Sequence, residues 1–166
     1  MRHNSQNIDC LDKHRKGKQQ MIYLKPITLD NINDFKNTSY DNMTFEQKQE
    51  MITESINKIH NNMYFEFLVV YKNDVVIGFM NLFAHSKHIV SCGPTIKDEF
   101  KCKGFGFEAE QLALKYAKDK GFTIAVGGVD DNNIASIKLH EKLGFELERK
   151  YLNKQGRAIR LYIKAI

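Results

Sequence analysis

The most informative stretch of the sequence is Lys101-Cys102-Lys103-Gly104-Phe105-Gly106-Phe107. It lies between a segment typical of a strand, residues 88–96, and a helical pattern that runs to about Lys120. A helix start has several backbone N–H groups without internal partners, and the helix dipole favours negative charge there. Glycines let the backbone come close to a phosphate, and the two lysines add cations beside it. The stretch therefore predicts a pyrophosphate cradle, while a tight connection with two solvated lysines is the alternative that this loop alone leaves open.

The glycine spacing excludes the commoner phosphate loops. Gly104-x-Gly106 lacks the third glycine of the dinucleotide fingerprint, and no G-x-x-x-x-G-K-[ST] motif occurs in the chain. The loop also comes late in the sequence rather than after the first strand. Rossmann and P-loop folds are therefore disfavoured.

A second informative stretch, NIASIKLHEKLGF at residues 133–145, follows a predicted strand over Thr123–Val129. Asn133 is a residue type that caps helix starts, and Gly144 is a residue type that ends them. The pattern predicts a short helix between these two positions, lying directly after a buried strand.

The two stretches together resemble the GCN5-related N-acetyltransferase (GNAT) superfamily. Lys101-x-x-Gly104-x-Gly106 is similar to the first family motif, [Arg/Gln]-x-x-Gly-x-[Gly/Ala]. About thirty residues later, N-x-x-S-x-x-L-H-E-K-L-G-F is similar to the second, Asn-x-x-[Ala/Ser]-x-x-Leu-Tyr-Glu-Lys-x-Gly-Phe, which is the more specific motif. The Leu-His-Glu at residues 139–141 resembles phosphinothricin-type acetyltransferases, a branch of the superfamily. With the order of strands and helices included, the resemblance covers residues 21–166.

The expected architecture is α/β (α+β), with a mixed, mostly antiparallel central sheet of about seven strands flanked by about four helices. Residues 21–166 are expected to form a single domain, since no linker, internal repeat or low-complexity segment interrupts them. Strand patterns cover Met21–Thr28, Tyr64–Tyr71, Val75–Ala84, His88–Ile96, Thr123–Val129, Phe145–Leu152 and Ile159–Ile166, and helical patterns cover Asp30–Lys36, Thr44 to Ile59, the segment ending near Lys120, and Asn133 to Gly144.

The resemblance implies an acetyl-CoA-dependent transfer of an acetyl group to a primary amine, by direct attack in a ternary complex. It implies that backbone N–H groups of Lys101, Cys102, Lys103, Gly104, Phe105, Gly106 and Phe107 hold the CoA pyrophosphate. The strand end at Ile96 would pair with the pantetheine arm, and that strand and Thr123–Val129 would splay apart to admit it. Asn133 would hydrogen-bond the pantetheine or shape the helix that lines it. The acceptor would be a small-molecule or protein amine, selected by residues 30–62 and 152–159.

The chain departs from the family pattern in three places. Lys101 stands where Arg or Gln is usual, and a long cation still suits phosphates. His140 stands at the position of the Tyr that protonates the departing thiolate; a packed or solvated helix histidine is the alternative. Cys92 and Gly93 stand where the family often has a Glu, so the base is unassigned. Candidates are Glu66, His85, His88, and a water chain to Asp130 or Asp131.

Charge and composition narrow the function classes. Five basic and two acidic residues among the first 20 supply +3 of the net charge of +5, so residues 1–20 are expected to be a disordered basic tail, an extension, or sequence before an internal start at Met21. A nucleic-acid binder needs a basic face on its folded part, so nucleic acid is disfavoured. No apolar run approaches the roughly 18 residues of a membrane span, and no secretory signal is recognisable.

Three scattered cysteines, Cys10, Cys92 and Cys102, form no disulfide framework, which favours the cytosol. His85, His88 and Cys92 lack a fourth partner for a metal, so no metal is expected. Cys92 is not expected to carry an acyl group, because no paired base can be assigned to it. A homodimer is left open. The rival class is a CoA-binding sensor or scaffold module that does not catalyse.

Overall fold

The computed structural model describes residues 21–166, and the expectation for residues 1–20 lies outside that range. Two 3₁₀ helices, Leu29–Phe35 and Asp98–Phe100, accompany the regular elements. The strands and helices in chain order are β1 (Ile22–Pro26), α1 (Phe45–Asn57), β2 (Ile59–His60), β3 (Met63–Lys72), β4 (Val75–Ala84), β5 (Ile89–Ile96), α2 (Phe105–Asp119), β6 (Ile124–Asp130), α3 (Ile134–Lys142), β7 (Glu146–Leu152) and β8 (Ala158–Ala165).

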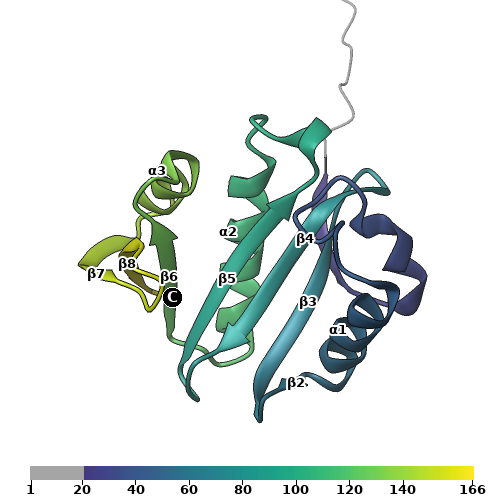
Figure 1. Ribbon diagram of the computed structural model, residues 1–166, viewed down its shortest axis with the longest axis horizontal. Coiled ribbons are helices and arrows are strands. Elements are labelled where there is room, and N and C mark those ends of the chain that lie inside the picture. The colour runs from purple at the N-terminus through teal and green to yellow at the C-terminus, as the bar shows by residue number, and fades with distance from the viewer. Residues whose placement is uncertain (1–20) are drawn as a thin grey trace, which may run out of the picture.

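The strands form one sheet in the order β1-β3-β4-β5-β6-β8-β7, with β2 paired to β3 (Figure 1). Among the described strands, β5 and β6 are the one parallel pair, and the other neighbours are antiparallel. The structure confirms the expected mixed, mostly antiparallel sheet with four flanking helices, one of them the 3₁₀ helix Leu29–Phe35. The additional strand is β2, two residues that follow the left-handed turn at Lys58 (φ 58°).

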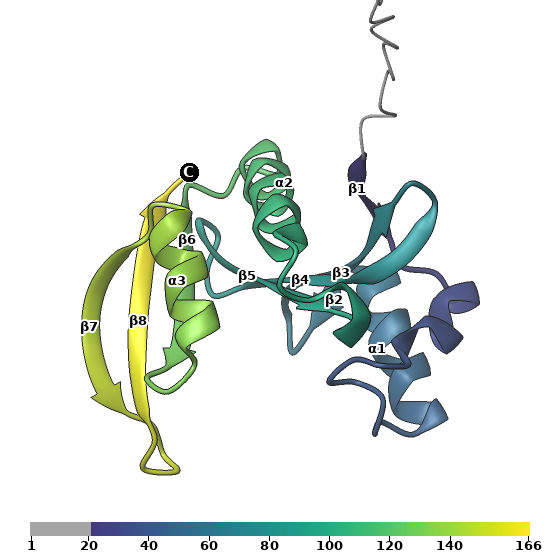
Figure 2. The ribbon, with the colours of Figure 1, turned by 90° about the horizontal axis from the view of Figure 1, so that it is seen from above.

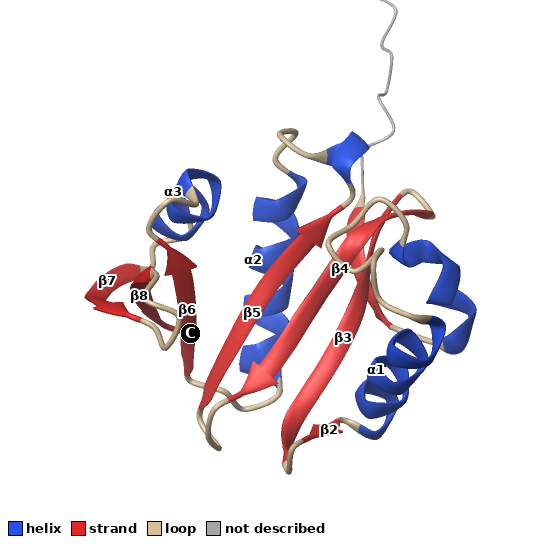
Figure 3. Cartoon of the chain, in the orientation of Figure 1, coloured by secondary structure: helices blue, strands red, loops and turns tan. Residues whose placement is uncertain are grey.

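Helices α1 and α2 cover opposite faces of the sheet, which Figure 2 shows from above and Figure 3 by secondary structure. Under α2 the core includes Ala109, Ala113 and Ala117, whose small side chains let the helix lie close to the strands. Under α1 the core is aromatic: Phe35 stacks on Phe79 with ring centroids 4.6 Å apart. The sheet is thus sandwiched near its centre and presents two chemically different faces.

The parallel pair separates along its length, which creates the site. Only Ile89, Val90 and Ser91 of β5 pair with β6, opposite residues 124–126. Beyond this point β6 continues to pair with β8, and β5 with β4. The carboxyl-terminal halves of β5 and β6 therefore diverge with unpaired edges between them.

Candidate active site

A cleft of about 660 Å³ opens where β5 and β6 diverge. Its walls come from β5, β6, the loop before α2 and the start of that helix, and α3, together with Asn81 of β4. Of the ten residues that the sequence marks as cofactor-binding or catalytic, six line this cleft: Ile96, Lys101, Cys102, Gly106, Asn133 and His140. The other four, Lys103, Gly104, Phe105 and Phe107, are not part of its lining.

The β5 edge presents peptide groups to the cleft. Lys97 N–H donates to Ile77 O on β4, so the alternation of an antiparallel ladder turns the peptide groups of Ile96, Pro94 and Cys92 away from β4. Pro94 has no N–H. The parallel pairing of Ser91 with Val126 uses Cys92 N–H, so Ile96 supplies the N–H donor along the unpaired part of this edge, with carbonyl acceptors beside it. Such an edge can pair with an extended amide-containing chain.

The start of α2 forms the second wall. Within residues 21–166, no hydrogen bond uses the N–H groups of the six residues from Cys102 to Phe107, whereas Lys101 N–H donates to Asp98 O at 3.3 Å. Gly104 is the N-cap with φ +85°, a conformation that L side chains rarely adopt, and it has no side chain to cap the helix. The free donors and the helix dipole together fit a diphosphate.

The two lysines of the loop are engaged with the preceding 3₁₀ helix. Lys101 Nζ lies 2.6 Å from Asp98 Oδ1, and Lys103 Nζ donates to Glu99 O at 2.7 Å. Both side chains are exposed, so these contacts are weak and exchangeable. Phe105 is buried in the core, and Phe107 lies under Lys142, whose Nζ is 4.2 Å from the ring centroid.

Asn133 caps α3. Its Oδ1 accepts from Ser136 N–H at 3.1 Å, which shapes the helix that lines the cleft. Its Nδ2 makes no hydrogen bond to any described residue, so a donor remains available on the cleft side of the cap.

His140 is buried in the wall formed by α3, β6 and β8. Its Nδ1 lies 2.8 Å from Ser136 O; a carbonyl can only accept, so Nδ1 carries the proton. The ring stacks on Tyr162 with centroids 5.4 Å apart and meets Phe145 edge-on. Burial lowers the pKa of His140, and the Ser136 carbonyl opposes this only in part. The ring is therefore neutral near pH 7, with its lone pair on Nε2.

Gly127 makes room for that ring. A Cβ at this position would lie 2.2 Å from His140 Nε2 and 2.7 Å from Cδ2, which no real packing allows. The neighbouring Gly128 faces the other way, since its Cβ would meet only Ile159 Cγ2 at 3.7 Å. Sequence reasoning did not single out Gly127, because its importance depends on a contact between β6 and α3.

Glu110 is a further residue that sequence reasoning missed. It lies on the buried face of α2 with no exposed surface, and neither carboxyl oxygen has a hydrogen-bond partner among residues 21–166. Burial raises the pKa of Glu110 to about 8, and burial together with Glu110 raises the pKa of Cys92 to about 12. Cys92 therefore stays a neutral thiol and is unsuited to covalent acyl transfer. In the sequence, Glu110 lies among Ala109, Ala113 and Ala117, which form the buried face of α2, and this position was the available signal that Glu110 is buried.

Glu66, one of the candidate bases, is held in a structural network. It accepts from Lys58 Nζ at 2.8 Å, from Tyr116 OH at 3.0 Å, and from Tyr64 OH. Burial raises the pKa of Glu66, but these donors together hold it below its usual value. The network ties α1, β3 and α2 together and lies outside the cleft lining.

The other candidate bases also lie outside the cleft lining. His85 and His88 are exposed, and the carboxylates of Asp130 and Asp131 pair with Arg157 and Arg160. Within residues 21–166, no three His, Cys, Asp or Glu side chains gather as a metal site. None of the helices in that range is long and apolar enough to cross a membrane.

The sequence and the fold are similar to those of known acetyltransferases. A sequence model of the "Acetyltransferase (GNAT) domain" matches residues 22–146, so the chain belongs to this family. An L-methionine sulfoximine/L-methionine sulfone acetyltransferase from Pseudomonas paraeruginosa is 31% identical over 70 residues, 42% of this chain. That match spans only 37% of the relative's length.

Solved structures share the fold at low identity. An acetyltransferase from Salmonella typhimurium, described as modifying the N-terminal serine of ribosomal protein L7/L12, has a TM-score of 0.73 at 15% identity and covers 87% of this chain and 95% of that one. A spermidine N-acetyltransferase SpeG chimera from Vibrio cholerae and hSSAT has a TM-score of 0.74 at 18% identity, covering 86% and 95%. These likenesses define the architecture of the chain.

Proposed function

We propose that this chain is an acetyl-CoA-dependent N-acetyltransferase that acts on a primary amine in a ternary complex. The observation that carries the proposal is the cleft between β5 and β6. It combines unpaired strand edges, free N–H donors at the start of α2, and a buried histidine in its wall. The strand edge suits the amide-rich pantetheine arm, and the helix start suits the diphosphate.

His140 is proposed as the group that carries the proton. Bound acetyl-CoA supplies a thioester; transfer to an amine forms a C–N bond, breaks the C–S bond and moves one proton from nitrogen to sulfur. Because Nδ1–H is bonded to Ser136 O, Nε2 of the neutral ring must first accept this proton before donating it. The Ser136 carbonyl then stabilises the transient imidazolium. This order refines the role expected at the usual Tyr position, since a lone-pair nitrogen cannot donate first.

The acceptor is proposed to be a small-molecule or protein amine. The similar proteins named above are acetyltransferases of an amino-acid analogue, a protein N-terminus or spermidine. Membership of the family therefore does not by itself identify the acceptor. Cys92 and Cys102 are both free thiols, which supports a reducing compartment such as the cytosol.

The test pairs calorimetric titration of acetyl-CoA with thiol release in the presence of an amine panel. Binding together with amine-dependent thiol release supports the proposal. Tight binding of acetyl-CoA without thiol release in the presence of any amine would instead identify a CoA-binding sensor. The cleft lining contains no carboxylate that could act as a base, which favours this rival. Absence of binding would refute both.

His140→Phe tests the proton carrier. We expect kcat to fall by about 10²–10⁴-fold where chemistry limits turnover, with acetyl-CoA affinity nearly unchanged. His140→Tyr should restore part of the rate by the opposite order, in which the phenol donates its proton to sulfur before it regains one from nitrogen. His88→Phe, at an exposed histidine outside the cleft, is the matched control. A near-normal kcat in His140→Phe, with chemistry shown to be rate-limiting, would refute the assignment.

A further inference from the structure

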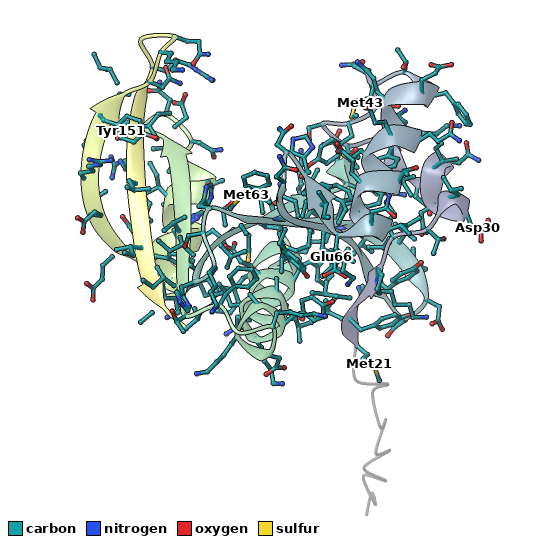
Figure 4. All side chains as sticks on the ribbon, turned by 90° about the horizontal axis from the view of Figure 1, so that it is seen from below. Met21, Asp30, Met43, Met63, Glu66 and Tyr151 are labelled. Atoms are coloured by element: carbon teal, nitrogen blue, oxygen red, sulfur yellow. The ribbon has the colours of Figure 1, made fainter. Side chains whose placement is uncertain are left out.

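A second groove of about 500 Å³ lies on the α1 face of the sheet, between α1 and strands β3 and β4. Phe65 of β3 and Phe83 of β4 line it from the sheet, and Met51 lines it from the helix. All three side chains are half-buried, so the groove has an apolar surface that water still reaches. Figure 4 labels Met43, another lining residue, which lies close to α1.

Asn81 connects this groove to the cofactor cleft, because it lines both. It lies on β4 opposite Gly93 of β5, and its Oδ1 reaches within 3.0 Å of where a Gly93 Cβ would lie. Its side-chain amide makes no hydrogen bond to any described residue. A molecule in the groove can therefore pass an amine across Asn81 and Gly93 to the point where β5 and β6 diverge.

The groove is acidic. Glu50 and Glu54 line it, and no Lys or Arg does, although basic residues outnumber acidic ones in the chain. Glu54 is held by His60 Nδ1 at 2.8 Å, whereas no cation of residues 21–166 lies within 4 Å of the Glu50 carboxylate. Glu46, Glu50 and Glu54 follow one another at i, i+4 spacing along α1, an arrangement of like charges that weakens an isolated helix. A cation in the groove would relieve that repulsion.

We propose that this groove binds the acceptor, and that the acceptor is an aliphatic diamine or polyamine without a carboxylate. This inference rests on the proposed function. One nitrogen passes Asn81 toward the cleft and is acetylated. The methylene chain lies on Phe65, Phe83 and Met51, and a second ammonium remains between Glu50 and Glu54.

Charge distinguishes this class from its nearest rivals. A carboxylate on the acceptor would lie beside the Glu50 carboxylate, in a groove with no Lys or Arg to neutralise it. A monoamine would bury its alkyl chain but leave Glu50 unpaired. The groove therefore favours a second positive charge and disfavours a negative one.

Three probes that share a five-carbon chain test this class: 1,5-diaminopentane, lysine and 1-aminopentane. Lysine is the diamine with one carboxylate added, and 1-aminopentane is the diamine with one ammonium removed. The assay measures thiol release by the full chain at saturating acetyl-CoA. The kcat/KM for the diamine should be on the order of tenfold above that for lysine and that for 1-aminopentane, as expected for a charge-assisted hydrogen bond.

Variants of the groove assign the effect to Glu50. Glu50→Gln should raise KM for 1,5-diaminopentane and leave 1-aminopentane unchanged, and Glu50→Lys should shift preference toward lysine. Glu148→Gln, at an exposed acid on β7, is the matched control. Equal use of lysine and the diamine, or a diamine KM unaffected by Glu50→Gln, would overturn the acceptor class and leave acetyl transfer standing. Thiol release from no amine at all would refute the proposed function, and the acceptor class with it.

Discussion

Gly127→Ala should destabilise the chain through its contact with His140. The added Cβ would lie 2.2 Å from Nε2, and the ring cannot retreat because Tyr162 and Phe145 pack against it and Ser136 O holds Nδ1. Overpacking of this kind costs about 1–3 kcal/mol. Breaking the Nδ1 hydrogen bond adds roughly 1 kcal/mol. The reduced freedom of the unfolded chain returns about 0.4–1 kcal/mol. The net expectation is a loss of about 1–4 kcal/mol.

Gly128→Ala is the matched control, because its Cβ meets only Ile159 Cγ2 at 3.7 Å and should be neutral or slightly stabilising. The assay is equilibrium urea unfolding at a pH where His140 is neutral. In a His140→Ala background the clash disappears, so Gly127→Ala should then cost little, giving a coupling energy of about 1–3 kcal/mol. Equal stability of the two glycine variants, or the absence of coupling, would refute the described packing of His140 on β6.

Two further predictions concern Glu110 and Gly106. The folded-state pKa of Glu110, about 8, lies above its ordinary 4.5, so the folded chain retains a proton that the unfolded chain releases as pH rises. Between pH 5 and pH 8 the unaltered chain should therefore lose about 3 kcal/mol more stability than Glu110→Gln, and parallel pH profiles in denaturant titrations would contradict this. A Cβ at Gly106 makes only ordinary contacts, 3.7 Å to Ile96 and 3.9 Å to Pro94, so a side chain there should spare the fold while approaching the diphosphate. Gly106→Val should weaken acetyl-CoA binding by about tenfold or more in calorimetry, and unchanged affinity in a folded variant would refute the cradle.

The features of this protein that depend on neighbours along the chain could be predicted from the sequence. The strand and helix patterns, the glycine loop at 101–107 and the capping residue Asn133 are local signals, because hydrogen-bond periodicity and backbone freedom are set within a few residues. These signals predicted the element order, the mixed sheet and the family. They also marked His140 and Ile96, which the structure places in the walls of one cleft.

The features that depend on contacts between distant segments could be found only from the packed chain. The tautomer of His140 follows from its hydrogen bond to Ser136 O. The space for its ring comes from Gly127, and its lowered pKa comes from burial. Glu110 lies on the alanine face of an amphipathic helix, and only packing against the sheet removes its water and its hydrogen-bond partners. Asn81 joins the two grooves because β4 and β5 pair in a particular register. Desolvation and proximity are properties of the packed chain, so no local pattern could have predicted them.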